Sequence, residues 1–397
     1  MERDDVVIIS AVRSAIGAYG GQFKEVLGVP LGVPVMTEAI KRAGIDPAVI
    51  DDVGWGCCYQ RADNEVNVAR VTAIKSGVPP EVPAFTVMRV CTSSMWAMAQ
   101  GAIAIRQGYN SVFMAGGVES MSTVPYTIDT LRWGARMNNV VVRDMLWDGV
   151  TRIGVGPAMG ITAENLAEKY NISRQAQDEL SYQSHMKAVS AIKEGRFKEE
   201  IVPMEVPGRK GTTKIADTDE HPRADSSPAA LAKLPPIFKK DGCVTAGNAS
   251  GISDGASAVL IMRKSRADEL GVKPMARIVD FSVVGVDPDY MGWGPVPATE
   301  KLLQKTGLKL SDMGLIELHE AFAAQYLACE IGLELTKRRD IVNVNGSGVS
   351  LGHPVGATGA RLVVTLLHEM RRRNVQYGLA TLCGGGGLGM AMIIELP

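Results

Sequence analysis

Residues 84–117 read AFTVMRVCTSSMWAMAQGAIAIRQGYNSVFMAGG, and this stretch decides the predicted fold class. Ala84–Val90 has the short apolar composition of a strand, whereas Thr92–Arg106 has the apolar spacing of a helix. Val112–Ala115 predicts a buried strand that Gly116 and Gly117 halt. A strand, a helix and a second buried strand in this order indicate α/β layers with largely parallel strands.

The same order of elements recurs in residues 340–387. There Asp340–Asn345 predicts a strand, Gly346–Gly352 a glycine-rich turn, Ala357–Arg373 a helix and Gly378–Leu382 a buried strand. We interpret the two stretches as an internal duplication of structure with little residue identity. The alternative is the alternation of strands and helices that any α/β chain shows.

The rest of the chain extends these two halves. Val6–Ser10 predicts a buried strand, and Val33–Ala43 predicts a helix. Residues 121–250 are more polar, and they contain two predicted helices, Thr162–Tyr170 and Ser173–Gly195, the second with its first residue as N-cap. We interpret this region as an insertion that covers one face of the core, where substrate contacts are common.

Composition and charge exclude several classes of function. The 397 residues include 42 basic and 43 acidic side chains, a formal net charge of −1, so broad attraction to nucleic acid or an anionic membrane is not expected. The length predicts two or more domains. The N-terminus lacks a secretory signal and no run is apolar enough for a membrane span, so we expect a cytoplasmic protein. The six cysteines lack metal-ligand spacing, which predicts mostly free thiols and no metal.

Cys91 is the first candidate for chemistry, because it lies where the predicted strand Ala84–Val90 turns into the predicted helix. A thiol at a helix N-terminus feels the positive end of the helix dipole, which favours the thiolate. Backbone N–H groups at the same place can stabilise an oxyanion. The alternative is a small buried cysteine that only fills the core.

His353 and Cys383 are the candidates in the second stretch. Pro354 restricts His353 to extended geometry just before a helix, at the place that matches Cys91 in the first stretch. A duplicated fold would bring the two helix starts together as a Cys–His pair for nucleophilic catalysis. Cys383 precedes four glycines, whose bare backbone lets a substrate approach. The alternatives are a loop histidine that caps a helix and a cysteine of the core.

Two other motifs carry weaker signals. His319 and Glu320 begin HEAFAAQ, where a solvated pair or a metal ligand is an alternative, but no second histidine follows at the spacing of a zinc protease. The turn GSGVSLG at 346–352 superficially suggests a dinucleotide loop. Its third glycine is misplaced, and no acidic residue ends a following strand about 20 positions later.

Several long segments resemble those of the thiolases (acetyl-CoA acyltransferases), in the family's order and over nearly the whole chain. These segments are VPAFTVMRVCTSS, AGGVESMS, VTAGNASGISDGASAV, HEAFA, GHPVGATGAR and CGGGGLG. The resemblance implies an α/β fold with a duplicated βαβαβαββ core in five layers, αβαβα, and an inserted loop domain. It assigns residues 1–120 plus about 251–272 to the N-terminal half, 121–250 to the loop domain and 273–397 to the C-terminal half.

The resemblance also implies a reaction, the thiolytic cleavage of 3-oxoacyl-CoA or the reverse Claisen condensation of acetyl-CoA with an acyl-CoA. In it His353 takes the proton of Cys91, the thiolate forms an acyl-enzyme, and Cys383 removes a proton from the α-carbon of acetyl-CoA. The main-chain N–H groups of Cys91 and Gly385 would stabilise one oxyanion, and His353 with a water held by His319 the other. CoA and acyl-CoA are substrates, so no cofactor and no metal are expected.

The resemblance further implies a set of residues that contact CoA or line its pocket: Ser250, Arg223, Met159, Phe238, Ala246, Met291 and Phe322. His319 replaces the asparagine of the NEAF motif, as in thiolases associated with fatty-acid degradation. Further departures from the family pattern, at Met88, Ala158 and the Cys-Thr-Ser-Ser that follows Arg89-Val90, lie near the acyl pocket. They argue against a preference for acetoacetyl-CoA.

Two other functions are weighed against this one. A ketoacyl synthase-like condensing enzyme would lack a second catalytic cysteine and use a carrier protein, and a non-catalytic lipid-binding paralogue would lose the Cys/His/Cys set. The resemblance implies a homodimer or homotetramer and allows a partner subunit. Acyl length and physiological direction do not follow from the sequence.

Overall fold

A computed structural model describes residues 1–2, 4–61, 63–208 and 211–397. The strands are β1 (Val6–Ser14), β2 (Gly17–Ala18), β3 (Asp52–Gly56), β4 (Ala84–Val87), β5 (Val112–Ser120), β6 (Tyr126–Thr127), β7 (Arg143–Asp144), β8 (Ile201–Val202), β9 (Met204–Pro207), β10 (Thr213–Ala216), β11 (Ser253–Arg263), β12 (Ala276–Gly285), β13 (Leu315–Leu318), β14 (Tyr377–Gly384) and β15 (Leu388–Glu395). The helices are α1 (Gly28–Ala43), α2 (Val68–Lys75), α3 (Ser93–Arg106), α4 (Met145–Thr151), α5 (Met159–Lys169), α6 (Arg174–Lys193), α7 (Pro228–Leu231), α8 (Lys264–Glu269), α9 (Pro295–Thr306), α10 (Ala323–Gly332), α11 (Gly348–Leu351) and α12 (Thr358–Arg373).

The main strands form two groups with the orders β4-β3-β5-β11-β1 and β13-β14-β15-β12. A short antiparallel pairing of β1 with β12, at Val7–Arg277 and Ile8–Ala276, joins them. The strand pairs β3–β4, β3–β5 and β13–β14 are parallel, but the long pairs that β11 and β15 make are antiparallel. The prediction of largely parallel strands is therefore wrong, because antiparallel strands complete each group: β11 and β1 in the first, β15 and β12 in the second.

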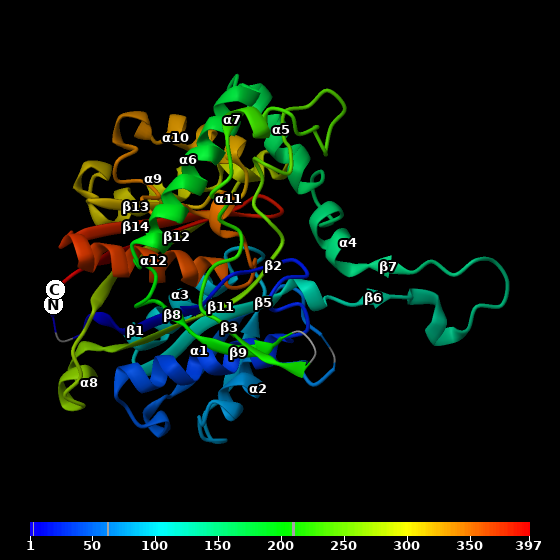
Figure 1. The fold of residues 1–397 in the computed structure, drawn as a ribbon. Coiled ribbons are helices and arrows are strands. Elements are labelled where there is room, and N and C mark those ends of the chain that lie inside the picture. The colour runs from blue at the N-terminus through cyan, green and yellow to red at the C-terminus, as the bar shows by residue number, and fades with distance from the viewer. Residues whose placement is uncertain (3, 62, 209–210) are drawn as a thin grey trace.

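Figure 1 shows the layers that these elements build. Helices α3 and α12 pack against each other between the two groups of strands. Helix α12 contacts strands of both groups, and α3 contacts strands of the first group and, through Arg106, β12 of the second. Helices α1 and α2 cover the outer face of the first group, and α9, with α10 beside it, covers that of the second. The predicted five-layered αβαβα fold is thereby confirmed.

The central position of α12 explains its composition. Every side chain from Thr358 to Met370 is buried, and the helix becomes exposed only at its three final arginines. A helix that is covered on all sides needs apolar or internally paired residues all round. The predicted N-cap of α6 is also confirmed, because the Ser173 hydroxyl accepts the Ala176 N–H at 3.1 Å.

Strand β5 corrects one predicted boundary. It continues through Gly116 and Gly117 to Ser120, although these glycines were expected to end it. A side chain at Gly116 would collide with the Ser257 carbonyl and the Trp55 ring, and one at Gly117 with the Gly356 carbonyl. The glycines are required for close packing against neighbouring backbone rather than for a turn.

The predicted strand Asp340–Asn345 is also wrong. Only Val342 forms a bridge, to Ile316 of β13, in the place where the first half has the full strand β4. Asn343 has a φ of 46°, which lies outside the strand region, and its side-chain amide bonds the main chain of Leu318 instead. A side chain thus replaces the backbone ladder at Leu318, the last residue of β13.

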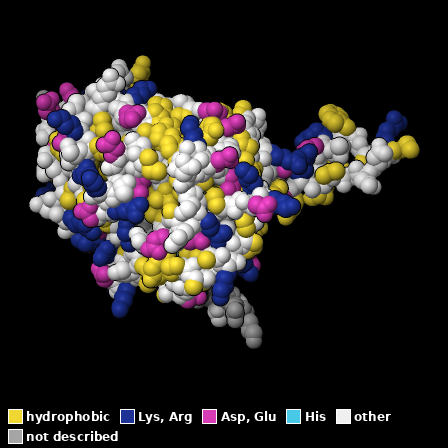
Figure 2. All heavy atoms as spheres, turned by 90° about the horizontal axis from the view of Figure 1, so that it is seen from above, with side chains coloured by type: hydrophobic (Ala, Val, Ile, Leu, Met, Phe, Trp, Pro, Cys, Tyr) yellow, Lys and Arg dark blue, Asp and Glu magenta, His cyan; other side chains and the backbone are white. Residues whose placement is uncertain are grey.

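Residues 121–155 leave the body of the molecule as an arm that includes β6, β7 and α4 (Figures 1 and 2). The arm exposes large apolar side chains, among them Trp133 (88% exposed), Met137 (86%) and Trp147 (59%). Within the described residues, no helix combines the length and the apolar character that crossing a membrane requires.

Candidate active site

Cys91 lies in a tight turn between β4 and α3. The strand ends at Val87 rather than at the predicted Val90, and α3 starts at Ser93. Val90 has a φ of 48°, which is rare for a β-branched residue. The Ser93 hydroxyl holds the turn, since it accepts the Arg89 N–H at 2.8 Å and donates to the Val90 carbonyl at 2.6 Å. Backbone strain of this kind persists where surrounding bonds impose it, and it gathers at functional sites.

The Cys91 thiol is buried and protonated at neutral pH. Burial raises its pKa to about 11, while the main-chain N–H groups of Gly385 and of Cys91 itself act in the opposite direction. The expectation that the helix start favours a thiolate is therefore wrong for the free protein, because desolvation outweighs the dipole. The two N–H groups that face the sulfur are those predicted to bind an oxyanion.

The His353 imidazole is held as a neutral base. Its Nδ1 lies 2.7 Å from the Thr358 hydroxyl, and this hydroxyl donates its own proton to the Pro354 carbonyl at 2.9 Å. Thr358 must therefore accept a proton from Nδ1, which leaves the lone pair on Nε2. Burial and then the charge of Arg361 lower the pKa of His353 to about 3. Nε2 is buried and has no hydrogen-bond partner among the described residues.

His319 lies against His353, with ring centroids 4.2 Å apart and an angle of 52° between the planes. Burial holds the pKa of His319 well below its usual range, and the neighbouring ionisable ring of His353 lowers it further. Neither of its ring nitrogens has a partner within the part of the chain that is described. Gly348 leaves room for this ring, since a Cβ there would lie 2.6 Å from His319 Cε1. The Nε2 lone pair of His353 can accept a proton, and the neutral ring of His319 can donate to a water or an oxyanion.

Cys383 lies at the end of β14 and is completely buried. Burial raises the pKa of its thiol well above the usual range, and the neighbouring Cys91 and Cys329 raise it further. Cys329 was not singled out from the sequence, and its thiol donates to the Gly292 carbonyl at 3.1 Å. The structure thus brings Cys91, Cys383 and Gly385 together, and separately pairs His353 with His319.

Glu119 links the loops that carry these groups, and sequence reasoning missed it. Its carboxylate accepts main-chain N–H groups from Cys58 at 2.9 Å, Tyr59 at 3.0 Å and Gly356 at 2.9 Å. Gly356 belongs to the loop of His353, whereas Cys58 donates its thiol to the Val90 carbonyl at 3.2 Å, next to Cys91. The only signal in the sequence was the motif AGGVESMS, which contains Glu119.

Replacing Glu119 by glutamine is expected to destabilise the fold by about 2–3 kcal/mol, because the amide group would face N–H donors that need an acceptor. The change is measured as a shift in the midpoint of denaturant unfolding. The exposed Glu25→Gln variant, which removes an equal charge, is the control. An equal shift in both variants would refute the linking role.

Acid is expected to destabilise the protein through its buried histidines. The pKa of His353 is about 3 in the folded chain, against an ordinary value of 6.5, so the unfolded chain binds the proton first as the pH falls. Stability is therefore lost between about pH 6.5 and about pH 3. At about pH 4 this amounts to roughly 3 kcal/mol, at about 1.4 kcal/mol per pKa unit. His353→Gln should lose less unfolding free energy on acidification; identical losses in both proteins would contradict this.

Six of the seven residues expected at the CoA site lie near the reacting thiols or on one loop. Met159, Phe238, Met291 and Phe322 pack in the same apolar cluster as Cys383. The rings of Phe238 and Phe322 meet edge to face, with centroids 6.0 Å apart. These side chains supply an apolar wall beside the thiols.

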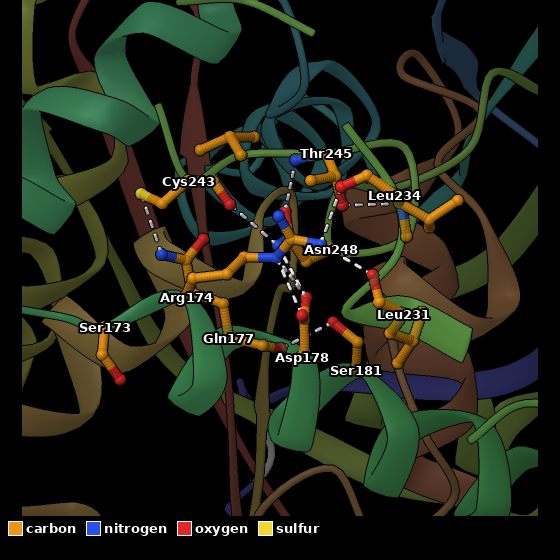
Figure 3. Close-up of polar contacts among 12 residues, drawn as sticks. Ser173, Arg174, Gln177, Asp178, Ser181, Leu231, Leu234, Cys243, Thr245 and Asn248 are labelled. Carbon is orange, nitrogen blue, oxygen red and sulfur yellow. Dashed lines mark hydrogen bonds and ion pairs between the residues drawn. The ribbon is translucent and has the colours of Figure 1, made fainter. Parts of the chain in front are cut away.

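Ser250 and Ala246 lie on a loop, residues 244–251, that a polar network fastens to α6 (Figure 3). Asn248 donates to the Asp178 carboxylate at 3.1 Å and accepts the Thr245 N–H at 2.8 Å. The Ser250 N–H donates to the Ala321 carbonyl at 2.9 Å, which ties the loop to the segment of His319. Arg223 is exposed and lies on a separate segment, 217–227, that precedes α7.

Comparisons with known proteins agree with this geometry. A profile of the thiolase N-terminal domain matches residues 6–265, and one of the thiolase C-terminal domain matches residues 272–396. The acetyl-CoA acetyltransferase of Syntrophomonas wolfei is 49% identical over 98% of this chain and 99% of its own length. The beta-ketothiolase BktB of Cupriavidus necator is 46% identical over 98% of this chain and 99% of its own length.

Solved structures show the same likeness. The acetyl-CoA acetyltransferase of Bacillus anthracis has a TM-score of 0.96 at 48% identity, covering 99% of each chain. Human mitochondrial 3-ketoacyl-CoA thiolase has a TM-score of 0.96 at 40% identity, covering all of both chains. The fold and these relatives define an α/β acyltransferase. More particularly, the chain belongs to the thiolase family and has thiolase activity.

Proposed function

We propose that the thiolase reaction of this protein runs through an acyl-enzyme on Cys91, with His353 as its base and Cys383 as the acid–base at the α-carbon. The observation that carries the proposal is the buried neutral thiol of Cys91, which faces two main-chain N–H groups. A thiol with a pKa near 11 needs a base in order to attack at neutral pH. The free Nε2 of His353 is the base that this site offers.

In the cleavage direction the Cys91 sulfur attacks the 3-oxo carbonyl carbon while His353 Nε2 takes the thiol proton. The N–H groups of Cys91 and Gly385 receive the oxyanion. The carbon–carbon bond then breaks, and its electron pair leaves as the enolate of acetyl-CoA, beside His319 and His353. Cys383 protonates the α-carbon. The thiol of an incoming CoA then gives its proton to the Cys383 thiolate and displaces the acyl group from Cys91, whose sulfur takes back the proton that His353 held. Condensation is the reverse of these steps.

CoA and acyl-CoA are the proposed ligands, with no other cofactor. A solved structure of human mitochondrial 3-ketoacyl-CoA thiolase holds CoA, and that protein is 40% identical to this chain. The proposed contacts are the loop residues Ser250 and Ala246, the exposed cation Arg223, and the apolar set Met159, Phe238, Met291 and Phe322. Among the described residues, no three or more His, Cys, Asp or Glu side chains are grouped to bind a metal ion.

The test is a thiolysis assay with 3-oxoacyl-CoA substrates of short, medium and long acyl chains. We expect turnover of all three, with acetoacetyl-CoA not the best substrate, because the residues at Met88 and Ala158 depart from the pattern of short-chain members. The same acyl groups on a carrier protein are the control for a ketoacyl synthase. Turnover of the carrier-bound substrates alone, or of none, would overturn the proposal.

The domain division and the assembly are proposed on the same basis. Residues 1–120 with about 251–272, 121–250, and 273–397 are the proposed N-terminal half, loop domain and C-terminal half. The exposed apolar side chains of the arm, including Leu131, Val141 and Val142, support a homodimer or homotetramer (Figure 2). Light scattering would test it, and a monomer would refute it. A cytoplasmic location is part of the same proposal.

A further inference from the structure

His221 lies outside the reacting groups but packs directly against the loop of His353. It belongs to the segment 217–227 between β10 and α7. A side chain at Gly251 or at Gly352 would collide with its ring, so both glycines are needed for the imidazole to approach. Gly352, which immediately precedes His353, has a φ of 95°. The ring of His221 therefore fills a space that two loops of the site leave open for it.

A chain of hydrogen bonds connects His221 to His353. His221 Nε2 lies 2.8 Å from the Ser253 hydroxyl, and this hydroxyl donates to the Gly251 carbonyl at 2.7 Å. A carbonyl can only accept, so the single proton of Ser253 is committed to Gly251, and His221 must be the donor to Ser253. The same hydroxyl also accepts the main-chain N–H of His353 at 2.9 Å. Ser253 thus holds His353 in place through an oxygen that His221 orients.

The other side of this segment faces the proposed coenzyme site. Arg223, two residues after His221, is exposed and is the cation among the seven proposed CoA contacts. Its main-chain N–H donates to His185 Nδ1 at 3.3 Å. A surface hollow is lined here by Ala18 and by residues 220–225, which include His221 and Arg223. A ligand that binds Arg223 therefore contacts the same short segment that carries His221. The His221 side chain bonds Ser253, and Ser253 in turn bonds the main chain of His353.

We propose that His221 is a positioning residue that couples occupation of the coenzyme A site to the placement of the His353 imidazole. This rests on the proposed function, because it assumes CoA at Arg223 and the base at His353. Catalytic groups lose rate steeply when they are displaced by fractions of an ångström, so a contact that fixes the base only when CoA is bound converts binding energy into rate. His221 itself touches neither the thiols nor the reacting carbon in this arrangement.

The experiment compares two substrates with the same acyl group: the 3-oxoacyl-CoA and its N-acetylcysteamine thioester, which lacks the nucleotide and cannot reach Arg223. In the parent enzyme the CoA substrate should have the higher kcat. His221→Phe keeps a ring but removes the donor to Ser253, and we expect it to lower kcat for the CoA substrate about ten-fold. For the N-acetylcysteamine thioester, kcat should fall by less than about two-fold. His221→Gln, whose amide can donate to Ser253, should restore most of the preference for CoA.

A second variant guards against misfolding of the first. Ser253→Ala removes the acceptor at the centre of the chain and should give the same selective loss. The double variant His221→Phe/Ser253→Ala should lose no more than either single variant, because one connection is broken in each. Equal losses on both thioesters, or no loss on either, would overturn the coupling. Failure of the proposed function would be distinguishable, since the parent enzyme would then cleave neither thioester.

Discussion

Cys91→Ser is expected to lower kcat for thiolysis by about four orders of magnitude or more, the largest effect of any single substitution in this chain. A serine hydroxyl is a far weaker nucleophile than a thiol and must be deprotonated by the same base. The site offers one buried imidazole, His353, whose pKa of about 3 makes it a weak base towards an alcohol. The oxyanion N–H groups remain, so substrate binding should change little while turnover disappears.

The measurement is release of acetyl-CoA in steady state, together with mass spectrometry of the intact protein after mixing with substrate. The parent protein should carry an acyl group on Cys91, and Cys91→Ser should carry none. Cys58→Ser is the matched control, because it removes a thiol that contacts the turn of Cys91 but keeps a hydroxyl donor for the Val90 carbonyl. The kcat of Cys58→Ser for thiolysis should fall by less than about ten-fold. Thiolysis by Cys91→Ser within ten-fold of the parent would remove the acyl-enzyme from the mechanism.

Cys383→Ala is expected to separate two half-reactions that Cys91→Ser abolishes together. Acyl transfer between Cys91 and CoA needs no proton at the α-carbon, so exchange of labelled CoA into an acyl-CoA should persist within about ten-fold. Cleavage of the carbon–carbon bond needs that proton and should fall by about 10³–10⁴. Cys383 is fully buried and interacts with Cys91, so its sulfur lies close to the proposed nucleophile.

Cys329→Ser is the control for this second prediction, since Cys329 is another buried thiol beside Cys383 and its bond is to the Gly292 carbonyl. We expect both half-reactions to survive in it. Retained exchange in Cys383→Ala also shows that the variant folds. Equal loss of exchange and cleavage in Cys383→Ala would mean that Cys383 supports the structure of the pocket rather than the carbanion step.

Local patterns in the sequence predicted the elements whose forces are local. The Ser173 cap, the helix α3 and the strand β14 all depend on neighbouring residues, and the structure places them within a few positions of their expected bounds. The prediction failed where a distant partner intervenes. Strand β5 continues through Gly116 and Gly117 because these glycines allow distant segments to pack closely against it. In residues 340–345 the side chain of Asn343, rather than a backbone ladder, bonds the end of β13.

The sequence by itself determined the order of the elements, the family and which thiols and imidazoles are available for chemistry, because these follow from residue types and their spacing. Only the tertiary structure decided their chemical state. The Cys91 thiol is protonated because it is buried. His353 presents Nε2 because Nδ1 is bonded to the Thr358 hydroxyl, whose own proton goes to the Pro354 carbonyl. Glu119 acquired its position from Gly356, 237 residues further along the chain, and His221 from Ser253, 32 residues further along. Desolvation and hydrogen-bond partners arise from the packing of distant segments, and no local pattern contains them.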